Sequence, residues 1–260
     1  MYEAFLEFTT SLAKEVGEIH LSYFRGDNLG IDTKSNIYDV VTRADKESEE
    51  YIASKVLAQF PDHKILGEEG GYRGNESADY VWVVDPLDGT NNYSQGLPVF
   101  CVSIALQYKG ETIVGVVYAP YLDELYTASK GGGAFLQSRM CEKKQLAVSK
   151  KQELNVSVLG TGFPYDKDVN PDNNSENLAR ILPNIRGVRR MGAAAYDICC
   201  VASGFLDGYW EQCLQIWDVC AANLILQEAG GVVYYYKENR GISEIVGNEQ
   251  IVSEIRKYVR

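Results

Sequence analysis

The residues best suited to chemistry in this chain of 260 residues lie in the run Asp85-Pro86-Leu87-Asp88-Gly89-Thr90. Proline fixes φ and lacks an N–H group, so Pro86 can turn the chain and bring the carboxylates of Asp85 and Asp88 to one side. Gly89 allows close approach of the backbone to a ligand, and Thr90 can begin a short helix whose free N–H groups suit a phosphate. An isolated Asp-Gly pair more often marks an ordinary turn, so the rest of the chain must decide.

Two further segments place acids at the border of an apolar element. Glu68 and Glu69 follow the run Lys64-Ile65-Leu66, and Asp218 follows Trp217 at the expected start of a helix. Taken alone, the two glutamates would be solvated loop residues and Asp218 a helix N-cap. If these acids lie close together without basic partners, their negative charges repel one another. A hard divalent cation, which prefers oxygen ligands, would neutralise that charge. The pattern therefore indicates a Mg²⁺ site.

The elements that must position these acids alternate irregularly along the chain. Apolar spacing predicts helices over residues 2–24, 45–60, 175–182, 193–202 and 218–229. It predicts strands over 80–84 and 154–159 and an antiparallel hairpin from 99–108 and 112–118; the strand 80–84 is expected to stop at Asp85. The chain has no internal repeat and no low-complexity linker. We expect two α/β halves, 1–140 and 141–260, packed as one globular unit.

Composition excludes several classes of function. The net charge is 25 − 36 = −11 and the pI is near 4.8, which disfavours nucleic acid and acidic membrane surfaces as partners. No window approaches the roughly 20 apolar residues of a membrane span. Acids stand near the N-terminus where a secretory signal has basic residues, so a cytoplasmic protein is expected. The six cysteines form no CxxC pair and are expected to be buried free thiols.

Three separated motifs carry a family resemblance. Gly67-Glu68-Glu69, the run from Trp82 to Tyr93, and Trp217 to Ala222 with Glu228 to Gly231 resemble the signatures of the inositol monophosphatase family, one of the Mg-dependent, lithium-sensitive phosphatases. Softer matches at 39–45, 130–135, 160–164 and 190–195 extend the resemblance over nearly the whole chain. It implies a mixed α/β (α+β) fold, a layered αβαβα sandwich, usually homodimeric. It also implies hydrolysis of a small phosphorylated polyol or sugar with two to three Mg²⁺ ions per subunit.

The resemblance also implies roles for individual residues. Glu68, Asp85 and the carbonyl of Leu87 would hold one ion, and Asp85, Asp88 and Asp218 a second, with Glu68 also facing a third, weaker ion. Most of these ligands lie in the N-terminal half, while Asp218 and the substrate contacts lie in the other. Thr90 and Asp45 resemble the pair that orients and deprotonates the attacking water, so they are the expected catalytic residues together with Glu68. The amides of Gly89 and Thr90 would hold phosphate oxygens.

Substrate choice depends on fewer residues. Glu211 matches the acid that accepts hydrogen bonds from inositol hydroxyls, and the amides near Ala193 and Ala194 match a helix start that contacts the ring. Without the resemblance, Glu211 would be a solvated residue at a strand end. The expected substrate is myo-inositol 1-phosphate, with fructose 1,6-bisphosphate and 3′-phosphoadenosine nucleotides as alternatives. Asn91 stands where the nucleotide phosphatases tend to place Lys, which weighs against the last.

An alternative of another class is a catalytically weak regulatory or binding protein with the same fold. The intact set of acidic and hydroxyl residues argues against lost catalysis but does not exclude a second role (Asp45, Glu68, Asp85, Asp88, Thr90 and Asp218). His20 and His63 lie outside every motif, and no catalytic role is expected for either.

Overall fold

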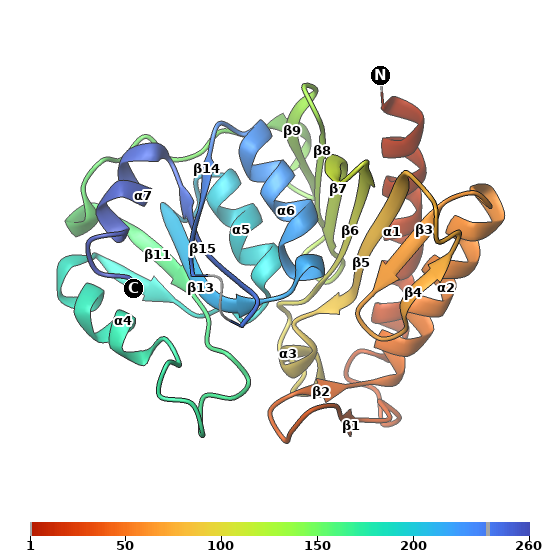
Figure 1. The fold of residues 1–260 in the computed structure, drawn as a ribbon, viewed down its shortest axis with the longest axis horizontal. Helices are drawn as coiled ribbons and strands as arrows, with labels where there is room; N and C mark the ends of the chain where they lie inside the picture. Colours follow the sequence, from red (N-terminus) through yellow and green to blue (C-terminus); the bar gives the residue numbers. More distant parts are fainter. Residues whose placement is uncertain (1, 238–239) are drawn as a thin grey trace.

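Helices and sheets alternate in five layers across the molecule (Figure 1). The computed structural model describes residues 2–237 and 240–260. Helices α1 (Glu3–Tyr23) and α2 (Arg43–Gln59) cover one face of an eight-stranded sheet, and α5 (Ala194–Ala202) and α6 (Ile216–Glu228) cover the other. A five-stranded sheet and then α4 (Ser175–Ile181) and α7 (Glu249–Ile255) complete the stack. The predicted αβαβα sandwich is confirmed.

The eight-stranded sheet contains β5, the strand that carries Asp85 and Asp88. Its strand order is β10-β9-β8-β7-β6-β5-β3-β4, and all its pairs are antiparallel except β3 with β5. The strands are β3 (Lys64–Gly67), β4 (Gly71–Gly74), β5 (Tyr80–Asp88), β6 (Cys101–Tyr108), β7 (Glu111–Ala119), β8 (Glu124–Ser129), β9 (Gly133–Ser138) and β10 (Cys141–Gln145). A two-stranded ribbon, β1 (Asp32–Thr33) with β2 (Val40–Val41), precedes α2.

The second sheet has the order β12-β11-β13-β15-β14. Its strands are β11 (Val158–Thr161), β12 (Gly187–Arg189), β13 (Gly208–Leu214), β14 (Val232–Lys237) and β15 (Ile242–Gly247). Because β10 pairs with β9, the first sheet reaches Gln145, past the expected boundary at 140. The division of the chain into two halves stays a prediction.

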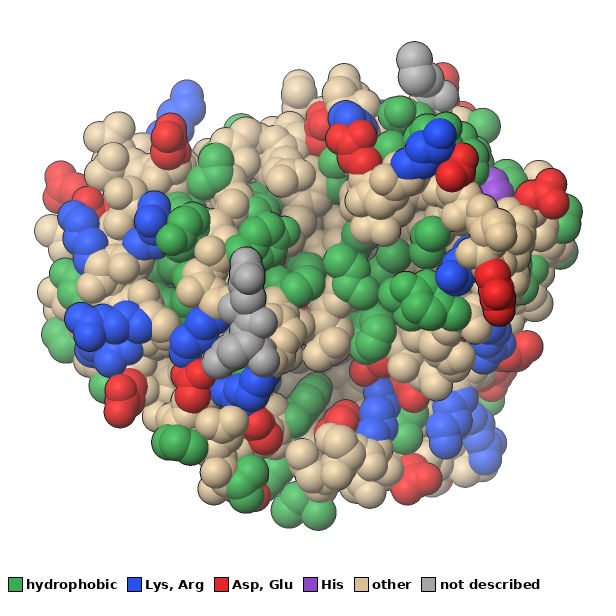
Figure 2. Space-filling view, in the orientation of Figure 1, with side chains coloured by type: hydrophobic (Ala, Val, Ile, Leu, Met, Phe, Trp, Pro, Cys, Tyr) green, Lys and Arg blue, Asp and Glu red, His purple; other side chains and the backbone are tan. Residues whose placement is uncertain are grey.

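Burial on both faces explains the apolar runs of the central strands. Along β5, Trp82 and Val84 pack into the core under α1 and α2, whereas Val83 packs into the core under α5 and α6. Since side chains alternate along a strand, Asp85 lies on the same face as Val83, toward α6. On the face shown in Figure 2, hydrophobic side chains gather over the middle and charged ones lie mostly toward the sides. The alternation along β5 thus directs the Asp85 side chain toward the middle layer, which α5 and α6 form.

Two predicted elements differ from the structure. The strand at 80–84 does not stop at Asp85 but continues to Asp88, with a register shift between Asp85 and Asp88, so Pro86 sits in a bulge rather than at a strand end. The expected strand at 154–159 begins as a 3₁₀ turn, Leu154–Val156, before β11. All six cysteines are free, and four of them are buried (Cys101, Cys199, Cys200 and Cys220). None of the described helices is both long and apolar enough to cross a bilayer.

Candidate active site

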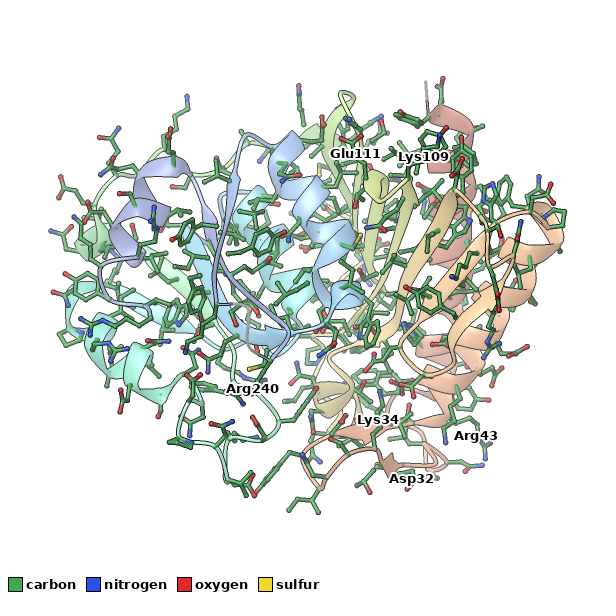
Figure 3. All side chains as sticks on the ribbon, viewed as in Figure 1. Asp32, Lys34, Arg43, Lys109, Glu111 and Arg240 are labelled. Atoms are coloured by element: carbon green, nitrogen blue, oxygen red, sulfur yellow. The ribbon has the colours of Figure 1, made fainter. Side chains whose placement is uncertain are left out.

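The residues singled out in the sequence meet at one cavity of about 450 Å³, beside the point where β5 leads into α3 (Thr90–Ser94). A cavity of this volume suits a small molecule. Lys34 and Arg240 both line it, and in Figure 3 Lys34 is labelled beside the N-terminal part of the chain and Arg240 beside the C-terminal part. All but one of the predicted site residues line it (Glu68, Asp85, Leu87, Asp88, Gly89, Thr90, Ala193, Ala194, Glu211 and Asp218). The exception, Asp45, lies directly behind Thr90.

The end of β5 is shaped by its own acids. The Oδ1 atom of Asp85 accepts the amide of Leu87 at 2.9 Å, which closes the bulge around Pro86. Asp88 accepts the amides of Ala194 at 3.1 Å and Ala195 at 2.8 Å. These amides begin α5, where the helix dipole favours an anion. Asp88 therefore joins the first sheet to the middle layer, and the Ala194 amide is not free for a substrate ring.

Gly89 makes the sharp turn between β5 and α3. Its φ of 90° is in the left-handed region, and a Cβ there would lie 2.9 Å from the carbonyl oxygen of Val99. The glycine expected from the sequence is thus required by both conformation and space. Thr90 follows at once and is buried with its hydroxyl toward α2.

Helix α2 presents Asp45 to Thr90. The Oδ2 atom of Asp45 accepts the amide and hydroxyl of Thr42 at 2.8 and 2.6 Å, a capping box that starts the helix. Its Oδ1 atom accepts the Thr90 hydroxyl at 2.8 Å. That hydroxyl also lies 2.9 Å from the carbonyl of Leu87, and since it has one proton it donates to only one of them at a time. Thr90 and Asp45 are thus hydrogen-bonded to each other, and their catalytic role stays a prediction.

Asp218 begins α6 on the other side of the cavity. Its Oδ2 atom accepts the amide of Gln215 at 2.7 Å, the same capping arrangement as in α2. The N-cap of α6 is Gln215 and Asp218 is the third residue of the helix, so the N-cap interpretation of Asp218 is wrong. Its carboxylate bonds the N-cap amide instead and also lines the cavity, and its role as a cation ligand stays a prediction.

Burial and mutual repulsion raise the pKa values of the acids in the cavity. Burial, followed by the charges of Glu68, Asp88 and Asp218, raises the pKa of Asp85 well above its ordinary value. Burial raises the pKa of Asp88 to about 6, and burial with the charge of Glu68 raises that of Asp218 well above its usual range. Each shift means that burial and the neighbouring acids disfavour the ionised form more than the charge of Lys34 and the local hydrogen bonds favour it.

A cation fits this donor set. Four carboxylates and the Leu87 carbonyl are hard oxygen donors of the kind Mg²⁺ prefers. The ammonium of Lys34 lies 2.7 Å from Glu68 and also bonds Glu69, so a positive charge already occupies one side of the cavity. Within residues 2–237 and 240–260, no three His, Cys, Asp or Glu side chains are close enough together to hold an ion as they stand.

Glu211 lies within β13 rather than at a solvated strand end. It is half-buried, lines the cavity, accepts a hydrogen bond from the Tyr209 hydroxyl, and faces Gly162. Burial raises its pKa to about 7. The solvated interpretation of Glu211 is therefore wrong, because Tyr209 of the same strand and Gly162, which follows β11, lie against the side chain.

The sequence interpretation missed Lys34 and His20. Lys34 lies outside every motif, directly after the two-residue strand β1, and nothing in its sequence surroundings marks it. The Nε2 atom of His20, buried in α1, lies 2.8 Å from the carbonyl of Pro86, next to Leu87. A lone histidine on an apolar helix face gives no sign of such a partner, because the contact spans 66 residues.

Comparison with known proteins agrees with this geometry. The model of the inositol monophosphatase family matches residues 1–258. The inositol-1-monophosphatase of Mesorhizobium japonicum is 36% identical, covering 100% of this chain and 94% of its own length. The Nus factor SuhB of Pasteurella multocida is 42% identical over 88% of this chain and 84% of its own. The inositol monophosphatase structure from Anabaena superposes with a TM-score of 0.85 at 37% identity, covering 99% of this chain and 97% of its own. The chain therefore belongs to the inositol monophosphatase family and is a phosphoric monoester hydrolase.

Proposed function

We propose that the protein hydrolyses the phosphate monoester of a small polyol, myo-inositol 1-phosphate in particular, with two to three Mg²⁺ ions per subunit. The observation that carries the proposal is the Thr90–Asp45 bond of 2.8 Å beside a cavity lined by Glu68, Asp85, Asp88 and Asp218. A homodimer and a cytoplasmic location, both expected from the sequence, are part of the same proposal.

The acids of the cavity would hold the ions. Glu68, Asp85, Asp88, Asp218 and the carbonyl of Leu87 are the donors, as the family resemblance implies. Bound Mg²⁺ supplies neutralisation of the phosphate charge and a lowered pKa for the attacking water. The chain itself then has to position the ester and move one proton.

Thr90 and Asp45 would move that proton. The Thr90 hydroxyl donates its proton to a hydrogen bond with Oδ1 of Asp45. The lone pairs of the Thr90 oxygen are then free to accept a proton from water. Burial raises the pKa of Asp45, so this carboxylate is a better base near neutral pH than an exposed aspartate. The amides of Gly89 and Thr90 would hold phosphate oxygens at the start of α3.

Glu211 would select the polyol, and substituting it tests the substrate. We expect Glu211→Gln to lose roughly 1.5–3 kcal/mol of charge-assisted hydrogen bonding, or about ten- to a hundredfold in kcat/KM for myo-inositol 1-phosphate. The loss should be small for p-nitrophenyl phosphate, which has no ring hydroxyls. Released phosphate is measured for a panel that includes fructose 1,6-bisphosphate and 3′-phosphoadenosine nucleotides.

A matched control comes from the neighbouring strand. Glu244 pairs with Glu211 across β13 and β15, is fully buried and bonds the Asn223 amide at 2.8 Å, but does not line the cavity. Glu244→Gln should leave the ranking of esters unchanged. A uniform loss over all esters in Glu211→Gln would assign Glu211 to the fold instead, and preference for another ester would replace the proposed substrate.

A second candidate role is binding to other macromolecules, favoured by the likeness to a Nus factor. Hydrolysis depends on the acids of the cavity, whereas a binding surface elsewhere does not. Expressing an Asp85→Asn variant in cells that lack the native protein distinguishes hydrolysis from binding, because this substitution removes a cavity acid and leaves other surfaces intact. A cellular function that survives this substitution belongs to the binding role.

A further inference from the structure

Helix α2 carries a second buried acid that the proposed chemistry does not use. Glu49 lies one helical turn after Asp45, so both side chains lie on the same face of the helix. Its side chain is only 3% exposed. An acid buried to this extent must be paired or hydrogen-bonded, and its partners show what it holds in place.

The partners of Glu49 are the two amides that follow Glu68. Its Oε2 atom accepts the amide of Glu69 at 2.7 Å, and its Oε1 atom accepts the amide of Gly70 at 2.6 Å. Hydrogen bonds to an ionised acceptor are stronger than neutral ones. On the other side, the amide of Glu68 itself donates to the carbonyl of Val84 at 3.2 Å. The backbone is thus held both at Glu68 and directly after it.

The glycines of this turn make room for the same carboxylate. A Cβ at Gly67 would lie 2.4 Å from Cδ of Glu49. A Cβ at Gly70 would lie 2.6 Å from Oε1 of Glu49 and nearer still to Nη2 of Arg73. None of these contacts is possible for a real side chain without displacement. The space beside Gly67 is thus filled by the Glu49 carboxylate, and the space beside Gly70 by the same carboxylate together with the Arg73 guanidinium.

We propose that Glu49 is a positioning residue, which fixes Glu68 for the cation by holding the amides of Glu69 and Gly70. One face of α2 then sets two parts of the site. Asp45 holds Thr90, and Glu49 holds the turn that presents Glu68. The inference rests on the proposed function, in which Glu68 is a cation ligand.

The neighbouring residue provides a matched control. Arg73 lies 3.6 Å from Glu49 through Nη2 and bonds the exposed Glu50 at 2.5 Å through Nη1. Glu50→Gln removes a carboxylate from the same helix and the same arginine without touching the turn. Glu50→Gln therefore measures what the loss of one charge on α2, or of one partner of Arg73, does by itself.

Calorimetric titration with Mg²⁺ and amide hydrogen exchange test the inference. We expect Glu49→Gln to weaken Mg²⁺ binding about tenfold, at the lower end of the effect of residues that hold metal ligands in place. Exchange of the Glu69 and Gly70 amides should become at least several times faster. The KM for the ester at saturating Mg²⁺ should stay unchanged, and Glu50→Gln should behave as the wild type in all three measurements.

Two more variants distinguish the possible failures. If Glu68→Gln binds Mg²⁺ as tightly as the wild type, Glu68 is not a ligand and the proposed function fails. If Glu68→Gln weakens binding but Glu49→Gln does not, or lowers only the melting temperature, the inference is wrong. Should Glu49→Gln not fold, Gly67→Ala decides, because it keeps every charge and the nearest atoms that its Cβ would meet all belong to the Glu49 carboxyl group. Unchanged Mg²⁺ affinity in Gly67→Ala then overturns the inference.

Discussion

Single carboxylates in this site serve a helix and the cavity at the same time. Asp45 caps α2 with one oxygen and bonds Thr90 with the other. Asp218 accepts the amide of Gln215 at the start of α6 and lines the cavity. Because the capping bond fixes the side-chain rotamer, the second oxygen is already oriented before any ligand binds. The same bonds that begin the two helices thus organise the site.

Substitutions at Asp88 and Thr90 should separate cation binding from proton transfer. Asp88→Asn removes a charge and replaces one of the two oxygens that accept the amides of Ala194 and Ala195, so Mg²⁺ affinity should fall about tenfold or more and turnover should fall with it. Thr90→Ala removes the hydroxyl that bonds Asp45, so turnover should fall about a hundredfold or more with little change in Mg²⁺ affinity. Mg²⁺ calorimetry and steady-state kinetics of both variants measure this.

Thr90→Ser serves as the control, because it retains the hydroxyl and should recover most of the turnover. Equal losses of Mg²⁺ affinity in Asp88→Asn and Thr90→Ala would contradict the separation of roles.

At the scale of elements, local signals were easier to predict than long-range contacts. The helices at 43–59 and 216–228 could be placed within two residues because apolar spacing and capping residues are local. The continuation of β5 through Pro86 could not, since a bulge depends on pairing with β6. The enclosure of Glu211 depends on Gly162 and Tyr209, and sequence spacing does not show which strand will lie beside it.

The bond from α1 to the β5 bulge gives a prediction at this scale. Burial lowers the pKa of His20 to about 4, so its ring is neutral near pH 7 and Nε2–H donates to the Pro86 carbonyl. His20→Ala leaves that buried acceptor unpaired, and the free energy of unfolding should fall by about 1–3 kcal/mol. Urea denaturation measures the change.

His20→Gln places an amide N–H at a similar distance along the side chain and should recover part of the loss. Equal stability of His20→Ala and the wild type would show that the bond contributes nothing. If Gln were no better than Ala, the imidazole would act through packing against Phe100 and Tyr93, whose ring centroids lie 6.0 and 6.2 Å away.

At the scale of the whole molecule, a net charge of −11 and a cluster of buried acids oppose the binding of a phosphate ester. A divalent cation reverses the sign of the charge where the phosphate must lie. Without it, burial and the neighbouring negative charges raise the pKa values of Asp85, Asp88 and Asp218 although Lys34 lies beside Glu68, so these acids take up protons more readily than exposed ones do. Cation binding and protonation of these acids should therefore compete.

This competition gives a pH dependence with a definite sign. A carboxyl whose pKa rises from 3.8 to about 6 on folding, as at Asp88, binds more protons in the folded than in the unfolded state between those values. Its contribution to stability is present below pH 3.8 and is lost as pH rises through 6. Mg²⁺ binds the ionised carboxylates, which are fewer at low pH. Its stabilising effect should therefore be small near pH 5.5 and larger near pH 8.

The melting temperature with Mg²⁺ or with EDTA, measured across that range, tests the competition, and released phosphate is assayed in the same samples. Hydrolysis should vanish in EDTA and return with Mg²⁺. Asp88→Asn has one fewer titrating acid, so the gain in stabilisation between the two pH values should be smaller than in the wild type. An equal Mg²⁺-induced shift at all pH values would mean that the ions bind away from these acids, and hydrolysis in metal-free buffer would contradict the role assigned to the cation.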